Sequence, residues 1–81
     1  MKLEAYALQK ILYTGEISSL TCKTAAGEIT ILDHHKPIIS VLAPGTIAIT
    51  ATDGKKSYFE VKSGFLEVQA GNSVRIIADI N

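Results

Sequence analysis

The sequence predicts an all-β fold, a two-sheet β-sandwich of about eight to ten short strands. Apolar and polar residues alternate with a period of two along most of the chain, and successive side chains of a strand point to opposite faces. Turn residues separate these runs at intervals of roughly eight to twelve residues, with one longer gap, which is typical of sandwiches and barrels. No segment predicts a helix, because the stretch of residues 9–13 is too short and Gly15 ends it.

Strands are expected where the alternation is clearest, and each should present one face to the core. Residues 38–42 are apolar and contain Ile and Val, so they predict a short buried strand. The other residues expected to face inward are Leu3, Ala5 and Ala7, then Ile47 and Ile49, Phe59 and Val61, Leu66 and Val68, and finally Val74, Ile76 and Ala78.

Turns are expected at the small and polar residues between these runs. Asp53-Gly54 predicts a two-residue type I′ hairpin, in which both central residues have positive φ. At Pro44-Gly45, proline fixes φ and glycine takes the left-handed position. The remaining expected turns are Gly15, Ala26-Gly27, Ser63-Gly64 and Gly71-Asn72.

Length and charge narrow the class of protein. The 81 residues are enough for one domain, which we place at residues 1–81. The 8 basic and 8 acidic side chains cancel, so the chain has no basic field that would gather nucleic acid. We therefore expect no nucleic-acid partner.

Cysteine content and hydropathy bear on the cellular location. Cys22 is the only cysteine, which excludes an intramolecular disulfide and suits a reducing compartment. Lys2 and Glu4 interrupt the apolar residues near Met1, so no signal peptide is expected. No run approaches the ~20 apolar residues that cross a bilayer. These features predict a soluble cytoplasmic protein without direct membrane insertion, although it can still act at a membrane by binding an embedded partner.

The cluster Asp33-His34-His35 is the one place where a metal ion could bind or acid–base chemistry could occur. On a strand, the adjacent histidines would point to opposite sides, and only one could join Asp33. On a loop both could bind, but a third ligand would have to come from elsewhere. The rest of the chain has none of the His or Cys spacings of metal motifs. A loop role, solvated or facing a partner, is the simpler interpretation.

No other feature predicts catalysis. Cys22 has no helix N-terminus beside it to activate its thiol, so a half-buried structural cysteine is expected rather than a nucleophile. The glycines match neither phosphate-binding fingerprint, and so small a sandwich leaves little depth for a substrate cleft. The residues alone predict a non-enzymatic binding or structural module without a cofactor. The acidic residues form no evident pair, although any two could meet in the fold: Glu16, Glu28, Asp33, Glu60 and Glu67.

Three stretches resemble the epsilon subunit of bacterial F-type ATP synthases. Residues 27–39 read GEITILDHHKPII, which is similar to the family's GE-φ-G-I-L-P-x-H-x-P-φ-φ segment. Residues 64–69 read GFLEVQ and lead to VRIIAD at 74–79, similar to the family's GGFLEVQ…V-x-φ-L-A-D ending. The opening residues 2–4 and the segment 15–17 are also similar, and Pro44-Gly45 falls at a family turn. The resemblance covers essentially the whole chain and implies the N-terminal β-sandwich domain of that subunit.

The sequence also departs from the family pattern. Thr30 and Ser63 replace glycines, and Asp33 and Lys23 replace prolines, which affects the local loop geometry more than the fold. Epsilon subunits usually continue into a pair of C-terminal helices, which carry an inhibitory switch and in some members an ATP site. Because the sequence stops at Asn81, neither function is expected of this chain.

The resemblance implies a central-stalk (rotor) subunit that attaches the gamma subunit to the membrane c-ring and couples ion-driven rotation to ATP synthesis. Its location would be the cytoplasmic face of the bacterial inner membrane. The family pattern places Glu28, His35 and Ala7 at the c-ring, and Ser40, Ile38 and Ile39 near gamma.

Simpler interpretations stay open. Glu28 can solvate a turn, His35 can be an ordinary loop residue, and Ile38 and Ile39 can pack in the core, because alternate strand residues face opposite sides. The alternative function is that of a generic β-sandwich adaptor that binds another protein.

Overall fold

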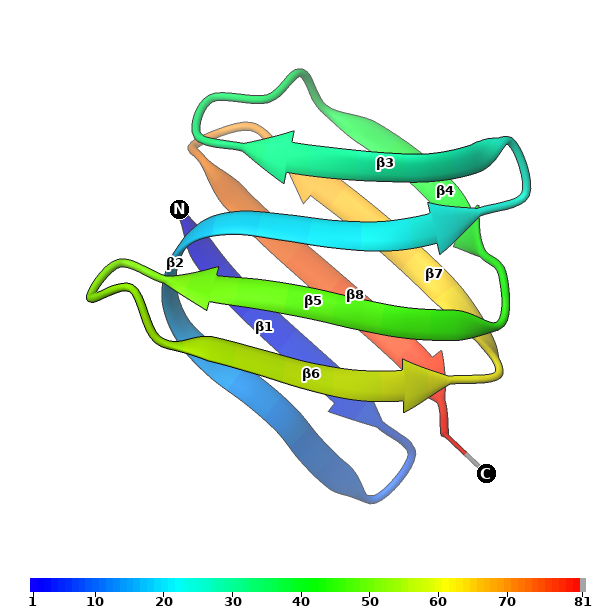
Figure 1. Ribbon diagram of the computed structural model, residues 1–81. Coiled ribbons are helices and arrows are strands. Elements are labelled where there is room, and N and C mark those ends of the chain that lie inside the picture. Colours follow the sequence, from blue (N-terminus) through cyan, green and yellow to red (C-terminus); the bar gives the residue numbers. More distant parts are fainter. Residues whose placement is uncertain (81) are drawn as a thin grey trace.

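The computed structural model describes residues 1–80, which form eight strands and no helix. The strands are β1 (Lys2–Ala7), β2 (Lys10–Thr24), β3 (Gly27–Leu32), β4 (Ile38–Leu42), β5 (Gly45–Ala51), β6 (Lys56–Val61), β7 (Ser63–Gln69) and β8 (Ser73–Asp79). Figure 1 shows them in two layers: β3, the second half of β2, β5 and β6 lie in front, and β4, β7, β8 and β1 lie behind. The predicted all-β sandwich is therefore confirmed, although β2 is not a short strand.

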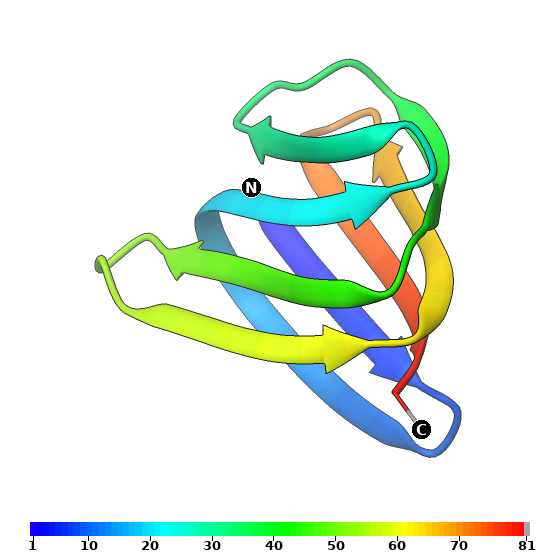
Figure 2. The same ribbon diagram turned by 45° about the vertical axis from the view of Figure 1, so that its right-hand side comes forward.

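The long strand β2 belongs to both layers. Over its 15 residues it first pairs with β1, from Lys10 to Glu16, and then with β5, from Ile17 onward. Gly15 lies at this change of partner with φ of 154°. The predicted turn at Gly15 is wrong, because the glycine here bends a continuous strand instead of ending it. Figure 2 shows the bend, where β2 passes from the rear layer to the front one.

The hairpin at Asp53-Gly54 is present, but it is not a type I′ turn. Of the two residues, only Gly54 has a positive φ, of 90°. The N–H of Gly54 donates to the carbonyl oxygen of Ala51 at 2.9 Å, and Oδ1 of Asp53 accepts from the N–H of Lys55 at 3.0 Å. This pattern belongs to the longer class of hairpin loop, in which a glycine in the left-handed region follows the turn.

The other expected turns agree only in part with the structure. Gly71-Asn72 joins β7 to β8 with φ of 86° and 60°, as expected for a tight connection. Ala26 and Pro44 also lie between strands, whereas Gly27 and Gly45, expected in the same turns, are the first residues of β3 and β5. Ser63-Gly64 was expected to be a turn, but both residues lie inside β7. The chain instead bends at Lys62, so the two strands meet one residue earlier than the sequence indicated.

The core lies between the two layers and contains most of the predicted inward-facing residues. Ala7 and Phe59 were expected in it but are only half-buried, and Cys22 is more deeply buried than expected, at 1% exposed. Each large apolar side chain that is fully buried stabilises the fold by about 1.5–3 kcal/mol. The largest of these are Leu3, Ile17, Leu20, Ile31, Ile47, Ile49, Leu66 and Ile76.

Strand β4 exists where it was expected, but it is not a buried strand. Ile38 and Ser40 are half-buried and Leu42 is buried, whereas Ile39 is 76% exposed and Val41 is 54% exposed. The reason is that β4 lies in the rear layer, so only one of its faces packs on the core.

Candidate functional site

The outer face of the rear layer carries an apolar row that runs from β4 to β2. Val41 pairs with Phe65, Phe65 with Ile77, Ile77 with Tyr6, and Tyr6 with Ile11. Val41, Phe65, Ile77 and Ile11 are each more than half exposed. Side chains directly opposite on neighbouring strands lie ~4.5–5.5 Å apart, so these residues form a continuous stripe. A contiguous exposed apolar surface of this kind makes the row a candidate binding surface.

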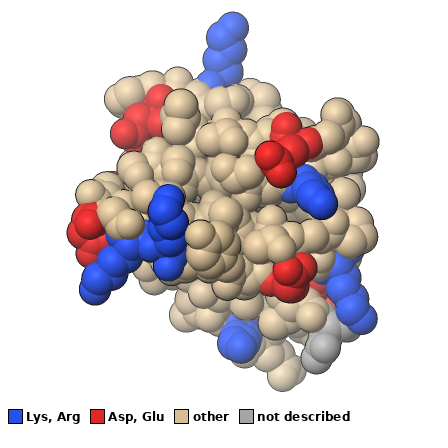
Figure 3. All heavy atoms as spheres, viewed as in Figure 1, with Lys and Arg blue, Asp and Glu red and all other residues tan. Residues whose placement is uncertain are grey.

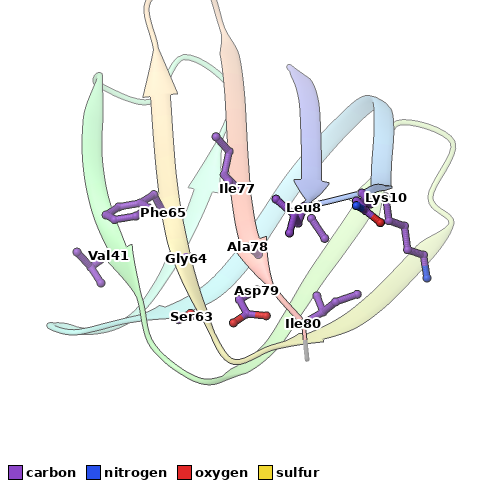
Figure 4. A pocket seen from close by; sticks show the side chains of 12 residues that line it. Leu8, Lys10, Val41, Ser63, Gly64, Phe65, Ile77, Ala78, Asp79 and Ile80 are labelled. Atoms are coloured by element: carbon purple, nitrogen blue, oxygen red, sulfur yellow. The ribbon is translucent and has the colours of Figure 1, made fainter.

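A groove of about 810 Å³ lies beside the apolar row. Figure 4 shows Val41 and Phe65 close together on β4 and β7, with Ile77 on the next strand and Leu8 in the turn between β1 and β2. Leu8 is 96% exposed. The lining is chiefly apolar. It comprises Ala7, Leu8, Gln9, Lys10, Val41, Ser63, Gly64, Phe65, Ile77, Ala78, Asp79 and Ile80.

A second, more polar row runs parallel to the apolar row. Ile39 pairs with Glu67, Glu67 with Arg75, and Arg75 with Glu4. The hydroxyl of Tyr6 donates to Oε2 of Glu4 at 3.0 Å. This hydrogen bond raises the pKa of Tyr6 above its usual value, with lesser contributions from desolvation and from the charge of Glu4. The face therefore presents apolar groups beside charges of both signs.

Glu28 and His35, expected at the c-ring, are associated with strand β3. Glu28 is the second residue of β3 and pairs with Lys23. His35 lies in the loop that follows the strand, where its N–H donates to the carbonyl oxygen of Leu32 at 3.2 Å. Both side chains belong to exposed residues. They lie at opposite ends of β3, which is an edge strand that pairs only with β2 among the described strands. A partner would have to extend along β3 to contact both.

Ala7 does not join Glu28 and His35. It is the last residue of β1 and lines the groove. In both ribbon views the turn after β1 lies at the lower end of the molecule, whereas β3 lies at the upper end. The structure therefore separates one of the three residues that the resemblance placed together.

The three residues expected near gamma lie in β4 but do not share a face. Ile38 packs against the core, and Ser40 is half-buried opposite Leu66. Ile39 points outward, next to the apolar row, and is 76% exposed. Of the three, only Ile39 can therefore offer a partner a largely exposed apolar side chain.

The loop cluster around Asp33 has structural partners. Oδ1 of Asp33 accepts from the α-ammonium group of Met1 at 2.8 Å and from Nδ2 of Asn72 at 3.2 Å. These hydrogen bonds, led by that of the ammonium group, hold the pKa of the Asp33 carboxyl below its usual value. Among residues 1–80, no three His, Cys, Asp or Glu side chains are grouped so that they could hold a metal ion.

Cys22 lies in the core, and burial raises the pKa of its thiol to about 11. The thiolate is therefore scarce near neutral pH, which does not suit a nucleophile.

The front layer has a different surface from the rear one. Figure 3 shows charged side chains of both signs interspersed over this face, with uncharged atoms between them and no broad field of one sign. In the part of the chain that the structure describes, no helix is long and apolar enough to span a membrane.

The apolar row was not predicted from the sequence, although the sequence contains a signal for it. Phe65 precedes the inward-facing Leu66, and Ile77 follows the inward-facing Ile76. The alternation therefore places Phe65 and Ile77 on the outer face, where polar residues are expected. Apolar residues at such positions are a signal for a candidate binding surface. Tyr6 and Ile11 could not be added to the row, because their pairing depends on a register shift between β1 and β2 after Ala5.

Residues 1–80 match the family model described as ATP synthase, Delta/Epsilon chain, beta-sandwich domain. Because the match covers nearly the whole chain, the protein belongs to this family.

Particular relatives are epsilon chains of bacterial ATP synthases. The chain is similar to that of Bordetella petrii, with 35% identity over 98% of this chain and 55% of the relative. It is similar to that of Dichelobacter nodosus, with 36% identity over 86% of this chain and 48% of the relative. It is similar to that of Psychrobacter cryohalolentis, with 41% identity over 84% of this chain and 49% of the relative. The chain thus spans about half the length of the curated relatives it matches.

Solved structures show the same fold. One similar chain comes from a structure of the Euglena gracilis mitochondrial ATP synthase with OSCP, F1 and c-ring, with a TM-score of 0.88 and 25% identity, covering 94% of this chain and 48% of that one. Another comes from the central stalk and c-ring of the Tetrahymena thermophila mitochondrial ATP synthase, with a TM-score of 0.81 over 96% of this chain and 62% of that one. At 21% identity, the second supports the fold alone.

Proposed function

We propose that this chain is the attachment domain of an epsilon-type rotor subunit of an F-type ATP synthase. It is not catalytic and needs no cofactor: it holds the gamma subunit with one surface and the c-ring with another, so that ion-driven rotation of the ring is coupled to ATP synthesis. The complex lies at the cytoplasmic face of the bacterial inner membrane. The observation that carries this proposal is the family match across residues 1–80.

In this proposal, gamma covers the outer face of the rear layer. Ile39, which the resemblance placed near gamma, lies on that face beside the apolar row. Ile38 and Ser40, the other two residues expected there, lie on the inner face of β4 and would act by holding Ile39 in place. Aromatic and large apolar side chains such as Phe65 commonly carry most of the energy of such interfaces.

The gamma contact can be tested by measuring the affinity of purified gamma for variants of this chain. Ile39→Ser combined with Phe65→Ser should weaken binding at least about tenfold, since each removes an apolar contact. Tyr58→Ser is the matched control, because Tyr58 is also exposed, at 63%, but lies on β6 in the front layer. Failure of the unaltered chain to bind gamma at micromolar concentration would contradict the proposal and favour the generic adaptor.

The c-ring contact is assigned to Glu28 and His35. A carboxylate and an imidazole can bond to the polar loop tips of a ring that extends along the edge strand β3. Both residues are exposed and lie at the two ends of that strand. Ala7 was also expected at the ring, but its distance from β3 means that such a contact would need a second ring surface near the groove.

This contact can be tested with c-rings reconstituted in lipid nanodiscs and a complex of gamma with this chain. Glu28→Ala combined with His35→Ala should reduce retention on the ring without changing the affinity for gamma. Glu60→Ala combined with Lys55→Ala is the control, because it removes two exposed polar side chains from β6 and the β5–β6 hairpin, away from β3 and the loop of residues 33–35. Unchanged retention by the first pair would exclude Glu28 and His35 as the ring contact.

A further inference from the structure

The α-ammonium group of Met1 is held by acceptors from two segments of the chain. It donates to the carbonyl oxygen of Ile17 on β2 at 2.9 Å and to Oδ1 of Asp33 at 2.8 Å. Oε1 of Glu16 lies 3.8 Å away, and Met1 as a whole is only 6% exposed. A hydrogen bond between an ammonium group and a carboxylate is roughly twice as strong as one between neutral groups.

Asp33 also binds the turn between β7 and β8. The Oδ1 atom that accepts from Met1 also accepts from Nδ2 of Asn72 at 3.2 Å. Oδ1 of Asn72 in turn accepts from the N–H of His34 at 2.8 Å, and its carbonyl oxygen accepts from the N–H of Lys2 at 3.1 Å. One network thus joins the start of β1, the loop after β3 and the turn before β8.

The same network holds two residues in an unfavourable backbone conformation. His34 has φ of 63° and Asn72 has φ of 60°, in the left-handed region that non-glycine residues rarely adopt. Such conformations persist only where surrounding contacts outweigh their cost. The loop of residues 33–35 therefore depends on the hydrogen bonds that the network supplies.

We propose that the α-amino group of Met1 is a modification-sensitive site whose free ammonium form fixes the loop of residues 33–35. An acyl group on this nitrogen (a formyl group, an acetyl group or a preceding residue) would convert it to an amide with one N–H and no charge. That amide cannot donate to both Ile17 and Asp33, and the acyl carbon needs space around a residue that is almost fully enclosed. If His35 contacts the c-ring as proposed above, the state of this amine also sets the position of that histidine, a consequence that rests on the proposed function.

The position of Cys22 allows a direct test. Native chemical ligation at Cys22 joins a peptide of residues 1–21, with a free or acetylated amine, to a peptide of residues 22–81, so the two full-length chains differ by one acetyl group. Hydrogen exchange then reports on the amides of His34 and His35, which donate to Asn72 and Leu32. Acetylation should accelerate their exchange at least about tenfold, and by more than it does for the amide of Ala51, which donates to Lys55 at the β5–β6 hairpin. Equal exchange in the two chains overturns the proposal.

A cycle of variants assigns the effect to Asp33. In Asp33→Ala the acetyl group should have a much smaller effect on the exchange of His34, whereas in Asp53→Ala, which removes another exposed loop carboxylate, the full effect should remain. An equally large effect in both variants contradicts the role of Asp33. Should the acetylated chain fail to fold, Asp33→Ala with a free amine replaces it, because it removes the acceptor of the Met1 ammonium group and leaves Oδ1 of Asn72, the acceptor of the His34 amide, in place. Faster exchange of the His34 and His35 amides in that variant than in Asp53→Ala supports the network, and unchanged protection overturns it.

Binding to the c-ring separates this inference from the proposed function. If acetylation releases the loop but leaves retention on the ring unchanged, the amine site stands and the assignment of His35 to the ring is wrong.

Discussion

Gly64 lies directly opposite Ala78 across β7 and β8, so close that a β-carbon at residue 64 would lie 2.4 Å from the carbonyl oxygen of Ile77. A backbone oxygen cannot move aside as a flexible side chain can, and φ of Gly64 is 150°, which other residues rarely adopt. We expect Gly64→Ala to lower the free energy of unfolding by about 2–4 kcal/mol, as measured by urea denaturation. Gly54→Ala should cost only about 1–2 kcal/mol, because φ of Gly54 is 90° but nothing lies within 4 Å. Equal losses in the two variants would show that the close approach does not matter.

The neighbouring residues Ile76 and Ile77 give a matched pair on opposite faces of β8. Ile76 is fully buried, and Ile77 is 55% exposed. Ile76→Ala should lower the free energy of unfolding by about 2–5 kcal/mol, since it leaves a cavity in the core. Ile77→Ala should cost less than about 1 kcal/mol. Thermal or urea unfolding measures both, and the reverse order would mean that β8 is displaced by one residue.

The thiol of Cys22 should be unreactive in the folded protein. Burial, and to a lesser extent the charge of Glu28, raises its pKa to about 11, so little thiolate is present at pH 8. The reagent DTNB should label Cys22 only as urea unfolds the chain, in parallel with the loss of the far-ultraviolet circular dichroism signal. Complete labelling in native buffer within minutes would mean that the core opens around this residue.

The carboxylate of Asp33 should stabilise the fold at neutral pH and not in acid. Its pKa is lowered below the ordinary value of 3.8, first by the hydrogen bond from the α-ammonium group of Met1. A carboxyl group whose pKa is lower in the folded state than in the unfolded state stabilises the fold. This stabilisation is fully present above the pKa of the unfolded state, and it is lost as the pH falls through the pKa of the folded state. Wild type should therefore be more stable than Asp33→Asn at pH 7, and the difference should shrink below about pH 4. The midpoints of urea unfolding of both proteins, measured from neutral pH to below about pH 4, give this difference in stability. Asp53→Asn is the reference for an exposed loop carboxylate. A difference that stays constant with pH would contradict the ion pair.

Much of the sandwich could be predicted because one face of each strand is buried. Val74, Ile76 and Ala78 alternate with outward-facing neighbours, and all three are buried. The glycines were harder to interpret, because a glycine that ends a strand and one that bends it give the same local signal. Gly15 proved to be a bend, since β2 has partners on both sides of it. The second of these partners, β5, lies far from Gly15 in the sequence.

The candidate surfaces were predicted less completely. The resemblance identified Glu28, His35 and Ile39, and their roles stay predictions. It also grouped Ala7 with the first two, and Ile38 with Ile39, although the fold separates both sets. The apolar row depends on the registers of four strand pairs, and register is set by the packing of the whole sandwich.

Strand β2 continues without interruption from its pairing with β1 to its pairing with β5. A twisting force on one layer would therefore reach the other along covalent bonds, and not only through side chains that can slide. The two layers cannot shear past one another unless this strand is stretched or its hydrogen bonds break. If the domain transmits torque as proposed, this shared strand holds its two layers in a fixed relation while the load passes between them.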